Sequence, residues 1–537
     1  MLARIGLAAM MAVATAVILH ETRGTTLWYD EWIWALHRRG GGAGTFLEPH
    51  NGHFSLVPLL LYKALFATVG IDHSAPYRVM IVVAHLVCTG LLFVYASRRI
   101  GAPAALLPAA LLLTLGPGWQ NILWPFQVAW LISLAAGLGA LLALDRGDRR
   151  GDVAACALVA LSLASCGLGI AIAIGLLVEL LWGRRAWRDA WIVAGPLAVY
   201  GVWWLGYQET GFWRHNVVLA PRFAADAVGG ALAAVTGLSD QHYANGTIID
   251  GGAGVAWGRP LALAGAALLI WRLAALRPVP ARVLTVLAMG AAFWLLTGLQ
   301  RSNLINPDAS RYVYVGALFV LLLAVELVRG VVLRSGVVAL LVCAAALAIL
   351  ANVGDLRSGA RFLRGEGPVA RADLGALELA RASVPPGYVA AHFPGAPFVP
   401  IGAAAYFAAA RDYGFKAYSP AEIAAGPEPA RLAADGELVS VLGLSVQQGG
   451  VAAAVGAGAP PRVDAVTGGT ARIQGGCVRF RPAAVRTAAT PAELAVTVPA
   501  GGLALTAAGS PATVAVRRFA VTFPRAPLAR RAPPGAG

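Results

Sequence analysis

The 537-residue chain is 58% hydrophobic and only 13% charged, with a mean hydropathy of +0.68. Soluble domains carry about a quarter charged residues, so this composition excludes an ordinary soluble globular protein. The formal net charge of +15 does not indicate nucleic-acid binding, because the arginines gather in short loops between apolar runs. The chain is therefore predicted to be a polytopic α-helical membrane protein.

Eleven apolar runs approach the length of about 17–25 residues that a helix needs to cross a bilayer. They cover residues 2–20, 77–96, 102–117, 122–144, 153–167, 168–183, 188–207, 257–276, 283–300, 312–328 and 336–353. The first run lacks a small-x-small cleavage site, so we interpret it as a retained first helix rather than a signal peptide. Two further stretches, 53–70 and 222–238, either cross the membrane or lie along its surface. The stretch 153–183 is either one long helix broken at the glycines near 167 or two short helices, and the arginines that follow it favour two.

Arginine-rich loops alternate with arginine-poor loops along these runs. The arginine-rich loops should be cytoplasmic, which places the N-terminus inside and the loops at 21–76, 116–121, 208–256 and 301–311 outside. The abundance of Ala, Gly and Arg, with only two lysines, is typical of a GC-rich bacterial genome. We therefore expect a multi-pass protein of the bacterial plasma membrane.

The pattern of the sequence changes after residue 354, where the long apolar runs end. A helix is expected over 370–383, and short alternating runs at 477–480, 494–498 and 513–516 predict strands of a small sheet or sandwich. We divide the chain into a membrane domain (1–354, with a first outer loop at 21–76), a mixed or β-rich domain (355–523) and a disordered tail (524–537). An odd number of helices before it places the C-terminal domain outside the cytoplasm.

An acidic pair follows the first apolar run directly. Residues 28–32 read Trp-Tyr-Asp-Glu-Trp, and a helix is expected from Asp30 to Arg38. Placing a carboxylate in apolar surroundings at a membrane surface costs free energy, and such residues often mark a functional site. A general base requires an anionic acceptor within hydrogen-bond reach of a hydroxyl. The alternative is an exposed acid favoured by the dipole of a helix N-terminus. Position favours the catalytic interpretation for Asp30 and Glu31, with Asp30 preferred because it lies closer to the membrane.

Further polar candidates lie in the same first loop. His50 and His53 flank an Asn-Gly turn and follow Glu48, a pattern that suits hydrogen bonding to a sugar or phosphate better than metal binding, since metals prefer three or four ligands. Lys63 is a further candidate for a pocket residue. The five cysteines show no disulfide or metal spacing. No metal site or cofactor is assigned, and a divalent cation remains an open alternative.

A polar segment opens the fourth apolar run on the predicted outer side. Trp119, Gln120, Asn121 and Gln127 could line a sugar-binding cavity, whereas tryptophans at this depth are more often an aromatic belt. Gln127 lies deepest, where polar side chains usually face protein or a cavity. The segment is therefore a candidate substrate-binding region.

Arginines are rare in the outer loops, which makes the segment 300–312 informative. Arg301 and Arg311 could each hold a phosphate bidentately, and Tyr312 lies beside the second. Snorkelling to the headgroups is the alternative, and we favour it for Arg301 but not for Arg311. Arg78, Arg214, His215 and His242 are weaker pocket candidates.

The order of these parts resembles the GT-C superfamily of polyprenyl-phosphate-dependent glycosyltransferases. The resemblance rests on the first helix, the acidic pair Asp30-Glu31 in the first outer loop, the late Ser310-Arg311-Tyr312 stretch, and a C-terminal domain like that of actinobacterial arabinosyl- and mannosyltransferases. It implies that Asp30 or Glu31 is the catalytic base and that Arg311 binds the donor phosphate. It also implies inverting transfer of a sugar from a polyprenyl-phosphate donor to a cell-envelope glycan or glycolipid acceptor on the extracytoplasmic face. A phosphate leaving group needs little acid catalysis, unlike an alcohol.

Two other classes of protein share a polytopic architecture. A transporter or flippase of lipid-linked glycans would place charges at the membrane midplane and show internal repeats, whereas the polar groups here gather in loops. A non-catalytic envelope scaffold would not need Asp30. The transferase is preferred over both.

Overall fold

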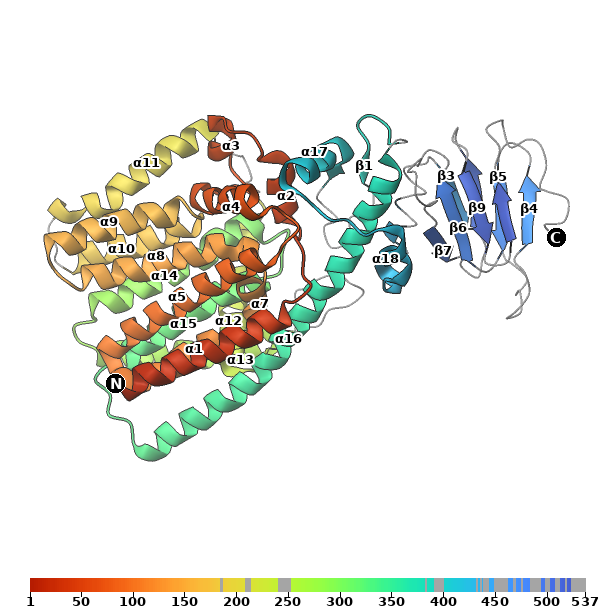
Figure 1. The fold of residues 1–537 in the computed structure, drawn as a ribbon. Helices are drawn as coiled ribbons and strands as arrows, with labels where there is room; N and C mark the ends of the chain where they lie inside the picture. The colour runs from red at the N-terminus through yellow and green to blue at the C-terminus, as the bar shows by residue number, and fades with distance from the viewer. Residues whose placement is uncertain are drawn as a thin grey trace. The chain divides into compact units, whose positions relative to one another are not determined.

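The computed structural model describes residues 1–183, 187–207, 214–239, 253–381, 384–390, 400–430, 433–434 and 437, and the eight strands β3 to β10 (Figure 1). The chain divides into two compact units. Unit 1 comprises Met1–Arg23, Gly40–Thr68 and Ser74–Leu363, and unit 2 comprises Gly24–Arg39, Val69–His73 and Arg364–Gly537. The predicted tail at 524–537 and the candidate His242 lie outside the described residues.

Unit 1 is helical. Its elements are α1 (Leu2–Glu21), α3 (Ala43–Leu47), α4 (Leu56–Val69), α5 (Ala75–Ile100), α6 (Ala102–Leu113), η1 (Gly116–Gly118), α7 (Trp119–Leu123), η2 (Pro125–Gln127), α8 (Val128–Leu144), α9 (Arg149–Leu163), α10 (Leu168–Trp182), η3 (Trp187–Asp189), α11 (Trp191–Tyr207), α12 (Asn216–Thr236), α13 (Ala253–Ala275), α14 (Ala281–Arg301), α15 (Ser310–Val328) and the first part of α16 (Ser335–Leu379). Every one of the predicted apolar runs overlaps a helix.

Eight described helices are long and apolar enough to cross a membrane, and a bent pair, α6 with η1–α7, makes a ninth. The chain is therefore a polytopic α-helical membrane protein. The stretch 153–183 forms two helices, α9 and α10, as the downstream arginines predicted. Of the two undecided stretches, α12 meets the length and hydropathy of a span, whereas α4 is a shorter apolar helix of 14 residues.

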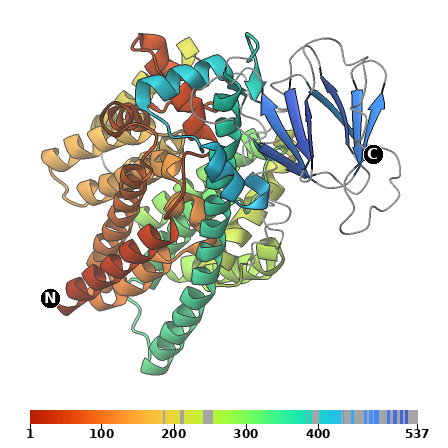
Figure 2. The ribbon, with the colours of Figure 1, turned by 45° about the vertical axis from the view of Figure 1, so that its right-hand side comes forward.

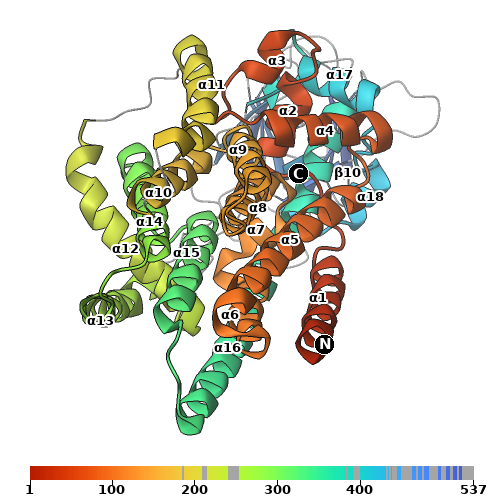
Figure 3. The same cartoon turned by 90° about the vertical axis from the view of Figure 1, so that its left-hand side faces the viewer.

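Helix α8 lies at the centre of unit 1, against α5, α9 and α10 (Figure 3). Of the stretch Pro125–Leu144, 78% is buried, compared with 6% of Ala256–Ala275 in α13. An apolar helix that buries little surface in the protein leaves its side chains to the lipid. Helix α13 is therefore peripheral, and the core of the unit is built around α8.

Unit 2 contains α2 (Asp30–His37), the end of α16, β1 (Val389–Ala390), β2 (Ile401–Gly402), α17 (Ala403–Tyr413), α18 (Pro420–Ala425), β3 (Leu444–Gln448), β4 (Arg462–Val466), β5 (Thr470–Gln474), β6 (Cys477–Pro482), β7 (Leu494–Thr497), β8 (Leu503–Ala507), β9 (Ala512–Val516) and β10 (Phe519–Thr522). The last eight strands form two antiparallel sheets in the orders β3-β8-β5-β4 and β10-β9-β6-β7, drawn in blue in Figure 2. The predicted strands at 477–480, 494–498 and 513–516 are confirmed as β6, β7 and β9, and the predicted helix after residue 29 as α2.

Two segments that the sequence separates are one helix. The apolar run 336–353 and the helix expected at 370–383 are joined in α16, which continues without interruption from Ser335 to Leu379. The intervening stretch is polar in composition but amphipathic, with Leu356, Ala360 and Leu363 buried at helical spacing. The chain passes from unit 1 to unit 2 inside this helix.

Candidate functional site

A broken helix carries the polar segment of unit 1. Helix α6 ends at Leu113, and the short turns that follow are bent by 51° from it. Pro117 and Pro125 lack the N–H that a continuous helix would use, and at Gly116 a Cβ atom would lie 1.7 Å from the Asn352 carbonyl oxygen of α16. Irregular backbone at membrane depth is tolerated only where it is buried in protein or lines a cavity. The break therefore sets residues 116–127 apart from an ordinary spanning helix.

Two candidates that are far apart in sequence meet at this break. Arg311, at the start of α15, donates from Nη1 to Oε1 of Gln120 over 3.2 Å, and the backbone N–H of Gln120 donates to the Ser310 hydroxyl over 3.0 Å. The Arg311 guanidinium also lies 5.3 Å from the centroid of the Tyr312 ring. Gln120, Ser310 and Tyr312 are buried. A planar cation thus stands beside a buried amide at the end of the bundle where α15 begins.

The loop with the two histidines is a tight turn on the same end of unit 1. His50 and His53 exchange backbone hydrogen bonds of 3.0 and 2.9 Å, and Asn51 and Gly52 between them have φ of 52° and 79°. Asn-Gly is the pair that accepts positive φ at both central turn positions. Arg301 donates to the Asn51 carbonyl over 2.6 Å. Arg301 therefore holds this turn, a role that the sequence did not reveal.

The imidazole rings face aromatic neighbours. The His50 ring lies 5.2 Å from Phe126, and the His53 ring lies 6.0 Å from Trp130, which in turn lies 6.0 Å from Tyr312. Trp130 was not singled out in the sequence, although it lies three residues after Gln127 at the start of α8. The aromatic side chains join the histidine turn to the start of α15, and we call this end of unit 1, with residues 49–55, 116–130 and 300–312, the aromatic end.

Two other candidates have structural neighbours that account for their positions. The Trp119 ring lies 5.9 Å from Phe362, and a Cβ on Gly359 would lie 2.4 Å from the Trp119 ring, so this indole packs tightly against α16. Lys63 donates to the Gly40 carbonyl over 2.7 Å and lies 5.2 Å from the Phe46 ring. Lys63 therefore stabilises the loop that carries α3.

Two buried amides at the aromatic end lack protein partners. Asn121 is completely buried, and among the described residues neither its Oδ1 nor its Nδ2 has a hydrogen-bond partner; the same holds for Oε1 of the buried Gln127. Leaving a buried polar group unsatisfied costs about 1–3 kcal/mol, so each case requires an explanation. A polar ligand that enters the break between α6 and α8 would supply the missing partners.

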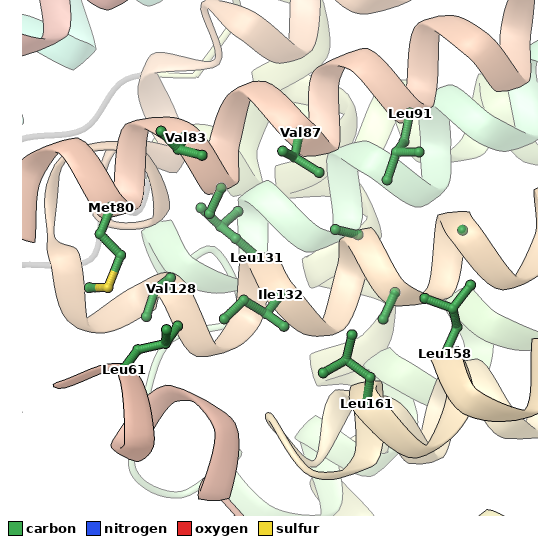
Figure 4. Close-up of a pocket in the computed structure, with 14 residues that line it drawn as sticks. Leu61, Met80, Val83, Val87, Leu91, Val128, Leu131, Ile132, Leu158 and Leu161 are labelled. Carbon is green, nitrogen blue, oxygen red and sulfur yellow. The ribbon is translucent and has the colours of Figure 1, made fainter. Parts of the chain in front are cut away.

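An apolar cavity of about 580 Å³ lies among the helices of unit 1 (Figure 4). It is lined by Leu61, Met80, Val83, Ala84, Val87, Leu91, Val128, Leu131, Ile132, Ala135, Ala136, Gly139, Leu158 and Leu161, from α4, α5, α8 and α9. Val128 directly follows Gln127, and Val83 and Val87 are exposed on the surface of the bundle. From Val128 to Gly139 the cavity follows α8 for about 16 Å, at 1.5 Å per residue. We call it the α5–α8 groove.

The acidic pair belongs to unit 2. Asp30 and Glu31 are both buried, and Oε2 of Glu31 accepts a hydrogen bond of 2.9 Å from the backbone N–H of Trp28. Tyr29, just before the pair, has a φ of 49°, which costs a non-glycine residue about 1–3 kcal/mol and persists only where the surroundings enforce it. Strained backbone of this kind clusters at functional sites. The strain and the burial both single out this turn.

No described group of three or more His, Cys, Asp or Glu side chains is arranged to hold a metal ion. His50 and His53 are joined through their backbone rather than through a shared site. Arg78, in the first turn of α5, donates to the Leu19 carbonyl over 3.1 Å and so caps α1. Lys63 and Arg78 therefore both hold neighbouring segments of the chain.

No protein-family model matches the chain, and no curated protein sequence matches it. Among solved structures, ArnT from Cupriavidus metallidurans bound to undecaprenyl phosphate is similar, with a TM-score of 0.45 and 16% identity, over 75% of this chain and 87% of that chain. The apo state of the same protein gives a TM-score of 0.43 and 17% identity, over 75% of this chain and 86% of that one. Values this low carry no argument about activity, which has to come from the residues of this chain.

Proposed function

We propose that the protein is a membrane glycosyltransferase that uses a lipid-linked sugar donor with a polyprenyl-phosphate carrier. The observation that carries the proposal is the presence of a cation, buried amides and an apolar groove in unit 1. Arg311 beside Gln120 suits a phosphate, the open hydrogen-bonding groups of Asn121 and Gln127 suit hydroxyl groups, and the α5–α8 groove suits a hydrocarbon tail. A polyprenyl-phosphate sugar has these three parts, with its phosphate between the sugar and the hydrocarbon tail.

In the proposed reaction, Asp30 removes a proton from an acceptor hydroxyl, whose oxygen attacks the anomeric carbon of the donor sugar. The bond from that carbon to the phosphate oxygen breaks in the same displacement, which inverts the configuration. Arg311 stabilises the charge on the departing polyprenyl phosphate. The acceptor is a cell-envelope glycan or glycolipid, and the reaction takes place on the extracytoplasmic face.

Glu31 and Asp30 have different tasks in this proposal. Glu31 accepts the Trp28 N–H and so closes the first turn of α2 on itself, as a capping carboxylate does. A carboxylate used in this way is needed for the conformation of the strained turn at Tyr29. The general base is therefore assigned to Asp30.

The orientation follows from the arginines. Arg98, Arg146, Arg282 and Arg329 stand at the helix ends opposite the aromatic end, and the positive-inside rule places such residues in the cytoplasm. The aromatic end then faces outward, where a lipid-linked donor of the outer leaflet would enter the groove sideways.

The test is sugar transfer by the purified full chain in detergent. Polyprenyl-phosphate mannose, arabinose, glucose and galactose are offered with a panel of envelope glycan acceptors to the wild type, Asp30→Asn and Glu31→Gln. We expect transfer by the wild type and a loss of about 10²- to 10⁴-fold in Asp30→Asn, the usual contribution of a general base. Equal activity in Asp30→Asn would refute the assignment of the base. Donor binding without turnover in the wild type would favour a transporter of lipid-linked glycans.

A further inference from the structure

The acid-bearing helix α2 is anchored by residues from the other end of the chain. Trp32, which directly follows the acidic pair, is completely buried, and its ring meets Phe415 edge-on at 5.1 Å and lies 6.4 Å from Tyr406. Its indole N–H donates to the Leu27 carbonyl over 3.0 Å, which ties α2 to the turn before it. All of these residues belong to unit 2. One side chain thus links the acidic turn to α17 and to the loop that follows α17.

A second link lies just beyond the C-terminal end of α2. Arg39 forms an ion pair of 2.9 Å with Asp412, near the end of α17. Both side chains are partly exposed, so the pair contributes at most about 1 kcal/mol in energy. Its importance is geometric, because with Trp32 it gives α2 two attachment points about two helical turns apart.

The segment 69–73 of the first loop is held by the same residues of unit 2. The Ile71 N–H donates to the Tyr413 carbonyl over 3.2 Å. At Gly70, with a φ of 70°, a Cβ would lie 2.0 Å from that same carbonyl oxygen, so only glycine fits the approach. Asp72 accepts from Arg371 and from the Lys416 N–H, both over 3.0 Å. Burial alone raises the pKa of Asp72, but Arg371 and the Lys416 N–H more than offset this and hold that pKa below its ordinary value.

Helix α16 supplies a further contact within unit 2. A Cβ on Gly367 would lie 2.8 Å from the Gly24 carbonyl oxygen, so the segment that leads to the acidic turn runs directly against α16. The acidic turn is therefore attached at residue 24, at Trp32 and at Arg39, in each case to residues after 363.

We propose that residues 403–418 are a positioning element for the acidic pair, so that this C-terminal segment is part of the catalytic machinery. The inference rests on the proposed function, because it concerns how Asp30 is held. A helix of eight residues is not stable by itself, and the strained Tyr29 needs surroundings that enforce its conformation. Residues 403–418 supply both. A displacement of about 1 Å in a reacting group can lower the rate about 10²-fold. Loss of the contacts from residues 403–418 should therefore lower kcat.

The test compares Phe415→Leu, Phe415→Tyr and a matched control in the full chain. Leucine removes the ring that Trp32 meets, whereas tyrosine retains it. The control is Glu422→Gln in α18, whose carboxylate caps its own helix through Ser419. Two quantities are measured: hydrogen exchange of the amides of residues 28–37 without substrate, and kcat and KM for sugar transfer.

We expect Phe415→Leu to increase exchange in residues 28–37 and to lower kcat by about 10- to 100-fold while KM for the donor changes little. Phe415→Tyr and Glu422→Gln should match the wild type in both measurements. Unchanged exchange in Phe415→Leu would overturn the proposal, and so would faster exchange with unchanged kcat. Because exchange is measured without substrate, a wild type that transfers no sugar would contradict the proposed function while the anchoring result still stands.

Discussion

The two ends of unit 1 differ in whether their buried polar groups have partners within the protein. At the end where the arginines gather, Arg99 pairs with Glu326 and, over 3.2 Å, with Asp145, and Arg282 pairs with Asp145 over 2.8 Å and with Glu179 over 2.7 Å. These groups come from α5, α10, α14 and α15 and from the residue after α8. At the aromatic end, Asn121 and Gln127 are buried with open hydrogen-bonding groups among the described residues.

This difference in hydrogen-bonding partners distinguishes an end that stabilises the fold from an end that is available to a ligand. A buried network in which each charge has a partner stabilises one arrangement of helices and leaves nothing for a ligand to bind. Buried amides without partners are a cost to stability that is retained where a ligand completes them. The arginine end therefore holds the bundle together, whereas the aromatic end is the proposed substrate site. The first three predictions below change unit 1 and ask whether stability or activity responds, and a fourth concerns unit 2.

The largest effect is expected at the arginine end. Glu326→Gln removes a buried partner of Arg99 and should destabilise the protein by about 3 kcal/mol, the usual cost of breaking a buried ion pair. The thermal midpoint in detergent measures the loss, and transfer per folded molecule should not change. Arg146→Gln, which breaks an exposed pair with Asp148, is the control and should have little effect. Lost turnover in folded Glu326→Gln would place function at this end as well.

The groove is tested by filling it. Gly139 lines the groove, and a Cβ there would lie 3.1 Å from Leu158. The ring in Gly139→Phe should therefore fill the part of the groove around residue 139. We expect KM for a long-chain donor to rise about tenfold, which corresponds to about 1.4 kcal/mol of lost tail binding. Gly195→Phe on α11, where a Cβ meets no atom within 4 Å, is the matched control. Equal KM values for both variants would show that the tail does not use the groove.

The open amides are tested by replacing them with an apolar residue of similar size. Asn121→Leu should leave the thermal midpoint unchanged or higher, because it removes a buried group without a protein partner, and should lower kcat/KM by about tenfold. Asn352→Leu is the comparison: its amide donates to the Ala234 carbonyl over 3.0 Å, so it should lower the midpoint. If Asn121→Leu also lowered the midpoint, Asn121 would belong to the framework and not to the site.

The smallest effect concerns pH at Asp72 in unit 2. Because the folded-state pKa of this carboxyl is below its ordinary value, its contribution to stability is complete above about pH 4 and is lost as the pH falls through the folded pKa. Exchange of the amides of residues 69–73 should therefore increase in strong acid, and Asp72→Asn should remove this step. An acid step of the same size in Asp72→Asn would assign it to another group.

Local patterns in the sequence predicted local structure well. Apolar length predicted the helices, and the arginines after residue 183 predicted the division between α9 and α10. The positions of Gln120 and Arg311 relative to the apolar runs predicted the same end of the bundle for both, although not that they touch. In each case the information lies within a few residues of the feature.

The features that sequence analysis missed depend on contacts between distant residues. The α5–α8 groove is lined by apolar side chains, and apolar side chains also cover other faces of the same helices. No sequence pattern therefore distinguishes the residues that line the cavity. The continuity of α16 was hidden because charged residues on one face mask the buried Leu356 and Leu363. The attachment of α2 to Phe415 joins segments about 380 residues apart in the chain. Nothing in the sequence of either segment indicates that the two are in contact.

The most direct test of the account is whether the aromatic end recognises the phosphate of a lipid carrier. The purified chain, as wild type and as Arg311→Gln, is titrated with a polyprenyl phosphate and with the corresponding polyprenol. We expect the wild type to prefer the phosphate by about 10- to 100-fold, as one or two charge-assisted hydrogen bonds allow, and Arg311→Gln to lose that preference while still binding the tail. Equal affinity of the wild type for both lipids, or an unchanged preference in Arg311→Gln, would contradict the account.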